Sequence, residues 1–288
     1  MLNLVIGAAA SGKSEYAEQV VMTLSGERIY LATMEPFGRE AEDRIARHRE
    51  LRAGKGFRTI ERPKGLAALP TGPDWNLLVE DLPNLAANEY FSPDGGGMDA
   101  VLCGIRHLVE TASDVTVVTG DLLSDGERYD AGTEAYLKML AELHLHLAEM
   151  ADNVIEVICG TPCTVKGTLP AVTPVRKKET VKGSYFITGP YGSGKREYVL
   201  RVLGIAEEDA AFEVQELLRA DPQQDLFGLA EELGSFRAVT QTEVGAGVIP
   251  LAAADRTWRE SAGRLACLLA ERADVVIRMV CGVPVRIK

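Results

Sequence analysis

Short apolar runs alternate with longer stretches of helical character along most of the chain. The runs at 2–6, 75–79, 115–119, 154–159 and 185–188 have the length of buried strands. The segment AYLKMLAELHLHLAEMADNVIEVI (135–158) predicts a long helix followed directly by a strand. This alternation predicts an α/β fold with a mainly parallel sheet flanked by helices.

Two pairs of segments within the chain have similar sequences, and the two pairs have different spacings. The segments GAAASGKSEYAEQV and GPYGSGKREYVLRV begin 182 residues apart, at 7 and 189. The segments ADNVIEVICGTPCTVK and ADVVIRMVCGVPVRIK begin 122 residues apart, at 151 and 273. Matching starts and ends with unequal spacing indicate a tandem duplication, with a net loss of about 60 residues from the second copy.

These repeats divide the chain into a complete first copy at 1–167 and a shortened second copy at 183–288. The segment between them, 168–182, holds two prolines and three adjacent basic residues. Such a composition is typical of an exposed linker.

The first copy opens with a complete phosphate-binding motif, G-x-x-x-x-G-K-[ST], placed between a predicted strand and a predicted helix. In such a loop the backbone wraps the phosphates, and the helix N-terminus offers unpaired N–H groups. The lysine neutralises the β- and γ-phosphates, and the following hydroxyl binds Mg²⁺. The predicted nucleotide-binding residues here are Gly7, Ala8, Ala9, Ala10, Ser11, Gly12, Lys13 and Ser14, and Lys13 is also a predicted catalytic residue.

The second copy carries a degenerate form of the same loop. It keeps the glycines and Lys195, but Arg196 stands where the magnesium-binding hydroxyl belongs. Magnesium-dependent turnover is therefore not expected there. The sequence leaves two interpretations open, a structural relic and a weak or regulatory nucleotide site.

Glu80 and Asp81 end an apolar run in the first copy. Proteins with a phosphate loop commonly place a carboxylate at such a strand end, against the magnesium ion or its waters. Glu80 is the better candidate of the two, both as a metal ligand and as a catalytic residue.

The net charge of −11, from 31 basic and 42 acidic residues, works against general attraction to nucleic acid or anionic lipid. No apolar run reaches the roughly 18 residues that span a bilayer, and the N-terminal segment lacks a basic leader. We therefore expect a cytoplasmic protein that binds phosphate locally.

His48 lies in a charged, helix-like segment, RIARHR at 44–49, and we do not expect it to belong to a core. Together with the phosphate loop, the ATM turn at 32–34, Arg52, the FRTIE stretch at 57–61, Glu80 and Asn88, this segment resembles the bifunctional adenosylcobinamide kinase / adenosylcobinamide-phosphate guanylyltransferase family of cobalamin biosynthesis. The resemblance implies a fold of the phosphate-loop NTPase type.

The resemblance also implies a two-step reaction that uses GTP, ATP and Mg²⁺. A nucleoside triphosphate first phosphorylates adenosylcobinamide, and His48 then attacks the α-phosphate of GTP and passes GMP to the phosphorylated product. Neutral imidazole suits this role, because its pKa near neutrality leaves an unprotonated nitrogen available. The residues matched to the guanine nucleotide site are Ala32, Thr33, Met34, Arg49, Arg52 and Glu61.

The first copy departs from the family pattern in one important stretch. Where the family has Asn-Glu-Val-Gly-x-Gly-x-Val-Pro, this copy has GDLLSDG at 120–126, whereas the second copy has TEVGAGVIP at 242–250. Ala53 also replaces a family proline, which weakens the assignments of Arg52 and Glu61. The hypothesis that follows is a composite active site to which the second copy contributes Glu243, Arg256, Arg259 and Arg264.

Two other interpretations stay open. One is a phosphate-loop small-molecule kinase without guanylyltransferase activity, and the other is a degenerate nucleotide-binding regulatory subunit. The donor in the first step, the copy that holds the corrinoid, and assembly into a homo-oligomer are also left open by the sequence.

Overall fold

The computed structural model describes residues 1–35, 54–170 and 183–288. The chain forms two compact units. Unit 1 comprises Met1–Ile6, Lys13–Glu156 and Thr164–Thr173, and unit 2 comprises Gly7–Gly12, Val157–Cys163 and Pro174–Lys288. The boundary between the units thus passes through the first phosphate loop, between Gly12 and Lys13.

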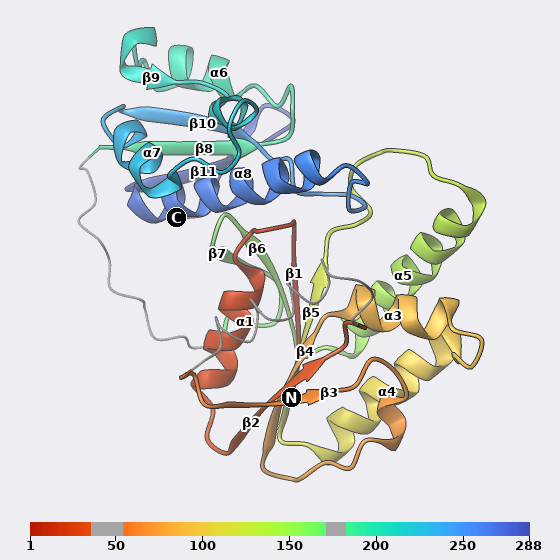
Figure 1. The fold of residues 1–288 in the computed structure, drawn as a ribbon. Helices are drawn as coiled ribbons and strands as arrows, with labels where there is room; N and C mark the ends of the chain where they lie inside the picture. The colour runs from red at the N-terminus through yellow and green to blue at the C-terminus, as the bar shows by residue number, and fades with distance from the viewer. Residues whose placement is uncertain (36–53, 171–182) are drawn as a thin grey trace. The chain divides into compact units, whose positions relative to one another are not determined.

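A seven-stranded sheet, in the order β3-β2-β4-β5-β1-β6-β7, is built mainly from unit 1 (Figure 1). The pairs β1–β6, β2–β3, β2–β4 and β4–β5 are parallel. The strands are β1 (Leu2–Gly7), β2 (Glu27–Ala32), β3 (Phe57–Glu61), β4 (Trp75–Glu80), β5 (Asp114–Gly120), β6 (Asn153–Ile158) and β7 (Thr161–Lys166). The α-helices are α1 (Lys13–Met22), α3 (Leu82–Phe91), α4 (Gly97–Thr111) and α5 (Ala131–Met150).

Unit 2 holds a five-stranded sheet in the order β12-β11-β8-β10-β9. The pairs β8–β10, β9–β10 and β8–β11 are parallel, and β11–β12 is antiparallel. Its strands are β8 (Tyr185–Gly189), β9 (Ala210–Ala211), β10 (Ala238–Thr242), β11 (Val275–Val280) and β12 (Val283–Arg286). Its α-helices are α6 (Lys195–Glu197), α7 (Leu226–Leu233) and α8 (Ala253–Arg272), and Val214–Leu218 forms a 3-10 helix.

Each unit has an apolar core of its own. In unit 1, β-strand residues such as Leu4, Leu77 and Val115 pack against Ile105 of α4 and Leu143 of α5, and all five are almost fully buried. In unit 2, Phe186 and Val276 pack with α8 residues such as Leu265 and Leu269. The strands expected from the apolar runs are all present, and the chain is an α/β protein with mostly parallel sheets flanked by helices.

The two sheets fit two copies of one design. Reading β4-β5-β1-β6-β7 against β9-β10-β8-β11-β12 gives the same order of strands. The turns after β6 and β11 are also alike, because Cys159 and Gly160 have positive φ angles of 49° and 76°, and Cys281 and Gly282 have 49° and 82°. Two successive residues with positive φ form the tight turn that suits a hairpin. Equivalent positions therefore have equivalent backbone geometry.

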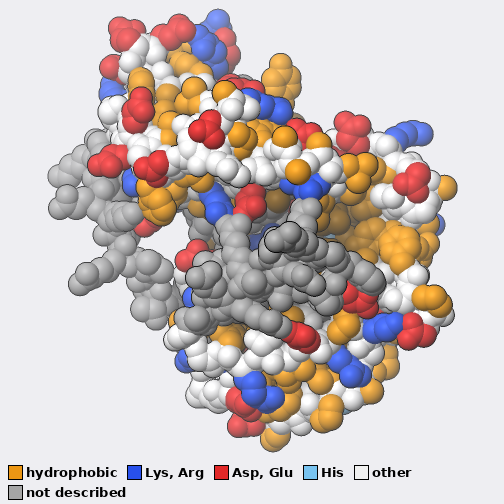
Figure 2. All heavy atoms as spheres, in the orientation of Figure 1, with side chains coloured by type: hydrophobic (Ala, Val, Ile, Leu, Met, Phe, Trp, Pro, Cys, Tyr) orange, Lys and Arg blue, Asp and Glu red, His pale blue; other side chains and the backbone are white. Residues whose placement is uncertain are grey.

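Charged side chains of both signs are dispersed over the face seen in Figure 2, in keeping with the net charge of −11. None of the helices within 1–35, 54–170 and 183–288 is long and apolar enough to cross a bilayer.

Candidate functional site

The first phosphate loop connects β1, which ends at Gly7, to α1, which begins at Lys13. Gly12 has a φ of +87°, a conformation that side chains other than glycine rarely adopt. A Cβ atom at this position would also lie 3.1 Å from the Cα of Gly160. The motif glycine is therefore required by backbone geometry and by close packing.

Ser14 and Glu80 meet in unit 1. The Ser14 hydroxyl, in the first turn of α1, donates a hydrogen bond to Oε1 of Glu80, the last residue of β4, at 2.7 Å. The other carboxylate oxygen, Oε2, is buried and has no hydrogen-bond partner among the described residues. The sequence placed these two residues at one metal site, and the fold brings them into contact.

Burial shifts the titration of Glu80. Desolvation, reinforced by the charge of Asp81, raises the pKa of Glu80 to about 7, although the Ser14 hydrogen bond and the Lys13 charge oppose the shift. An anionic carboxylate in a desolvated place gains stability from a cation. A cation bound beside Glu80 would therefore stabilise its charged form.

A hydroxyl and a carboxylate are hard oxygen ligands of the kind that Mg²⁺ prefers. Magnesium in nucleotide sites takes one or two ligands from the protein and the rest from phosphates and water. Ser14 and Glu80, with the unpartnered Oε2, fit such a site.

Thr33 fastens the end of β2 to the end of β4. Its backbone N–H donates to the Glu80 carbonyl at 3.1 Å. Its hydroxyl accepts from the Asp81 N–H at 2.7 Å and donates to the Asp81 carbonyl at 2.8 Å. Asn88 of α3 donates to the Thr33 carbonyl at 2.7 Å. Thr33 is fully buried, so its polar groups act on the position of Glu80 and Asp81.

The other predicted nucleotide-site residues of the first copy are only partly described. Ala32 and Met34 flank Thr33 and are half-buried, and Glu61 is exposed at the end of β3, where it pairs in register with Ala32. His48, Arg49 and Arg52 lie outside the described residues.

A comparison with known families decides the relationship. The family model described as cobinamide kinase / cobinamide phosphate guanyltransferase matches residues 3–165 and 220–287, which is well over half of the chain. The chain belongs to this family. The first matched range includes the phosphate loop, the segment 44–49 and Glu80. The second matched range includes Glu243 and all of α8.

A curated relative is the bifunctional adenosylcobalamin biosynthesis protein CobP of Pseudomonas aeruginosa. It is 30% identical over 175 residues, a stretch that covers 58% of this chain and 98% of the relative. Nearly the whole length of this relative thus aligns with little more than half of this chain.

The residues predicted from the second copy have clear partners in unit 2. Glu243, which follows β10, accepts two hydrogen bonds from Arg278, at 3.1 and 2.9 Å. On α8, Arg256 donates to the carbonyls of Pro250 and Leu251, and Arg259 donates to that of Val248. Arg264 forms an exposed ion pair with Glu260. Arg256 and Arg259 thereby hold the segment 248–251 against the start of the helix.

Unit 2 also includes the loop Gly7–Gly12. The Ala9 N–H donates to the Gly245 carbonyl at 2.9 Å. A Cβ atom on Gly245 would lie 2.7 Å from the Ala9 carbonyl oxygen, and one on Gly263 would lie 2.8 Å from the Ala10 Cβ. These two glycines therefore allow the loop to pack closely within unit 2.

Sequence reasoning missed Glu213, which pairs with Lys195 of the second loop. The structure shows the parallel: Glu213 follows β9 as Glu80 ends β4, and β9 and β4 hold the same place in their sheets. Because β9 has only two residues, no apolar run marks it in the linear sequence.

Proposed function

We propose that this chain phosphorylates adenosylcobinamide with a nucleoside triphosphate and then transfers GMP from GTP to the product, giving adenosylcobinamide-GDP. The observation that carries this proposal is the hydrogen bond from Ser14, the last residue of an intact phosphate-loop motif, to the Glu80 carboxylate. Membership of the cobinamide kinase/guanyltransferase family supports the choice of substrate.

In the first step the chain mainly positions charge. Lys13 neutralises the β- and γ-phosphates, and Ser14 and Glu80 hold Mg²⁺, which supplies further neutralisation when bound. Thr33 keeps Glu80 in place through the hydrogen bond to its carbonyl. The substrate hydroxyl attacks the γ-phosphorus and gives up its proton to water, the bond from that phosphorus to the β-phosphate oxygen breaks, and the nucleoside diphosphate leaves.

In the second step an unprotonated ring nitrogen of His48 attacks the α-phosphorus of GTP. A nitrogen–phosphorus bond forms, the bond to the β-phosphate oxygen breaks, and pyrophosphate leaves. A phosphate oxygen of adenosylcobinamide phosphate then attacks the same phosphorus and displaces the histidine. Ala32, Thr33, Met34, Arg49, Arg52 and Glu61 are the proposed surroundings of the guanine nucleotide.

The test is incubation of the purified protein with α-³²P-GTP and Mg²⁺, followed by denaturing electrophoresis with and without acid treatment. Acid-labile label that is absent from His48→Ala protein is the expected result. An unlabelled wild-type protein that binds GTP and phosphorylates adenosylcobinamide would be a kinase without the transferase step. Binding without either reaction would indicate the regulatory subunit.

We also propose that the second copy completes the active site through Glu243, Arg256, Arg259 and Arg264. The hydrogen bond between Ala9 and Gly245 supports this, because it joins the first phosphate loop to the glycine-rich segment after Glu243. Loss of transfer in folded Glu243→Ala or Arg264→Ala protein is expected. Full activity of residues 1–167 alone would contradict the composite site.

A further inference from the structure

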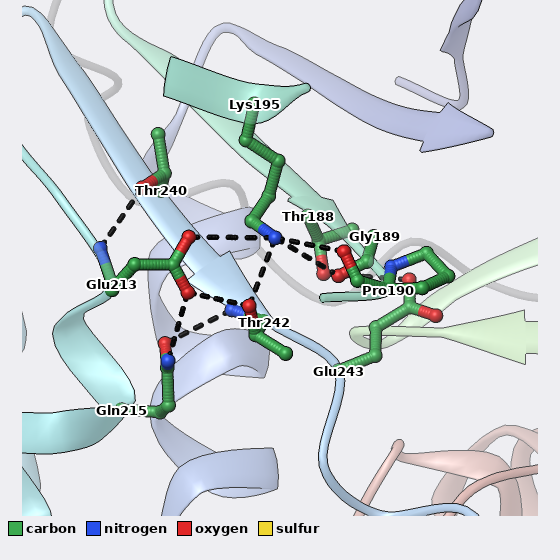
Figure 3. Close-up of polar contacts among 9 residues, drawn as sticks. All are labelled: Thr188, Gly189, Pro190, Lys195, Glu213, Gln215, Thr240, Thr242 and Glu243. Atoms are coloured by element: carbon green, nitrogen blue, oxygen red, sulfur yellow. Dashed lines mark hydrogen bonds and ion pairs between the residues drawn. The ribbon is translucent and has the colours of Figure 1, made fainter. Parts of the chain in front are cut away.

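The second phosphate loop holds its lysine in an unusual environment. Lys195 is 4% exposed, and its ammonium group lies among oxygen atoms of unit 2 (Figure 3). The Nζ atom donates to the carbonyls of Gly189 and Pro190, at 3.3 and 3.0 Å, and to Oγ1 of Thr242 at 2.8 Å. An ammonium group has three protons to donate, and these contacts engage all of them.

A carboxylate completes this environment. Oε1 of Glu213 lies 3.4 Å from the Lys195 Nζ. Its Oε2 accepts from the Thr242 hydroxyl at 2.5 Å and from the Gln215 amide at 2.9 Å (Figure 3). The lysine charge that a phosphate would neutralise is thus already neutralised by a side chain of the same unit.

The carboxylate is firmly held in its charged form. Burial alone would raise the pKa of Glu213, but hydrogen bonds from Thr242 and Gln215 and the charge of Lys195 outweigh burial and lower it. Glu213 has a positive φ of 50°, an uncommon conformation for a residue with a long side chain. Its backbone N–H donates to the Thr240 hydroxyl at 3.0 Å, which fixes that conformation.

The residues that follow Lys195 are also poorly suited to phosphate binding. The helix α6 after the loop has three residues and continues as a π-helical turn at Tyr198–Val202, whereas α1 has ten residues. A short, irregular helix directs fewer aligned N–H dipoles at an anion. Arg196, in the place of the Ser14 hydroxyl, pairs with Glu207 and stacks 4.4 Å from the Phe212 ring centroid.

The two copies therefore use equivalent carboxylates differently. Glu80, at the end of β4, accepts from the hydroxyl of Ser14. Glu213, just after β9, pairs with Lys195. We infer that the second phosphate loop does not bind nucleotides, because the Glu213 carboxylate neutralises Lys195 in place of a phosphate. The ion pair of Lys195 with Glu213 has a structural role instead and stabilises unit 2.

The inference predicts opposite effects for the lysines of the two loops. Lys195→Met leaves the half-exposed Glu213 carboxylate without its cation and removes the buried ammonium donor from the Gly189 and Pro190 carbonyls, and we expect it to lower the thermal midpoint by about 5 °C or more. It leaves the binding of ADP or GDP in the presence of Mg²⁺ within about twofold of wild type, because binding at the first loop does not use Lys195. Lys13→Met, the matched control, weakens nucleotide binding at least about tenfold and shifts the midpoint less.

The pair is tested by a double-mutant cycle. Glu213→Gln removes the charge and keeps the shape, and the double variant Lys195→Met, Glu213→Gln removes both charges. We expect the double variant to be clearly more stable than the sum of the single effects allows, because neither group is then left as an unpaired charge. An insoluble Lys195→Met protein rescued to solubility by Glu213→Gln would be the extreme form of this result.

Equilibrium dialysis with ADP and with GDP gives the binding count, and circular dichroism gives the thermal midpoints. Two bound nucleotides per chain, one of them lost in Lys195→Met, would overturn the inference, as would strictly additive stability effects. The cycle measures stability alone, so its result stands even if the proposed enzymatic function fails.

Discussion

The Ser14 hydroxyl donates to one oxygen of the Glu80 carboxylate, while the second oxygen is buried without a partner in the described part of the chain. We therefore expect Glu80→Gln to lower the rate of adenosylcobinamide phosphorylation by about 100-fold or more, because an amide offers Mg²⁺ no negative charge. The measurement is the initial rate as a function of magnesium concentration.

Glu89→Gln is the matched control for this variant. Glu89 is also a buried carboxylate of unit 1, but it accepts from the backbone N–H groups of Gly65 and Gly96. Its substitution is expected to lower stability and to leave the magnesium dependence unchanged. Equal magnesium dependence in wild type and Glu80→Gln would contradict the assignment of Glu80.

The titration of Glu80 predicts a pH effect on stability in the nucleotide-free protein. Its pKa is raised to about 7 from an ordinary value of 4.5, so the folded state holds the proton more tightly than the unfolded state. The stabilisation is complete below about pH 4.5 and is lost as the pH rises through 7. Relative to Glu80→Gln, the wild type should therefore lose stability between these limits.

Ser14→Ala sharpens the pH test. The Ser14 hydrogen bond lowers the pKa of Glu80. In Ser14→Ala protein, the loss of stability with rising pH should therefore occur at higher pH than in wild type. Urea unfolding at a series of pH values measures both effects. Identical profiles for wild type and Glu80→Gln would show that Glu80 does not titrate in this range.

Much of the fold follows from local sequence patterns. The apolar run before Gly7, the motif glycine at 12 and the acidic end of β4 are each determined by neighbours in sequence, and the structure has them as expected. The contact of Ser14 with Glu80 was also predictable, because parallel strands bring their carboxyl ends to one edge of the sheet.

Other features depend on contacts between distant segments. The raised pKa of Glu80 comes from burial, which no run of residues shows. The pairing of Lys195 with Glu213 depends on the fold, which places the residue after β9 beside the lysine of the second phosphate loop. Thr33 was expected beside the nucleotide, and only the fold reveals that its hydroxyl bonds both polar groups of the Asp81 backbone.

Thr33→Val removes that hydroxyl with little change in shape. The N–H and carbonyl of Asp81 then lose a buried partner, so we expect a loss of about 1–3 kcal/mol in the free energy of unfolding. Thr33→Ser keeps the hydroxyl and should recover most of this loss. Urea unfolding of the three proteins gives the comparison, and a Val variant as stable as wild type would exclude the positioning role.

The arginines of α8 predict a local effect in unit 2. Arg256 holds the segment 248–251 through the carbonyls of Pro250 and Leu251, and the Leu251 side chain is 99% exposed. Arg256→Met removes charged hydrogen bonds, so chymotrypsin should cleave after Leu251 about tenfold faster while the thermal midpoint changes little.

Arg264→Met is the control for cleavage. Its ion pair with Glu260 is exposed on one face of α8, where such pairs add little stability, so the cleavage rate should match wild type. Comparing the transferase rates of wild type, Arg256→Met and Arg256→Lys then separates two roles of Arg256. If Arg256 only braces the segment, Arg256→Lys restores both protection and transfer. If it also contacts the nucleotide, Arg256→Lys restores protection and leaves transfer impaired, because an ammonium group cannot reproduce the paired donors of a guanidinium.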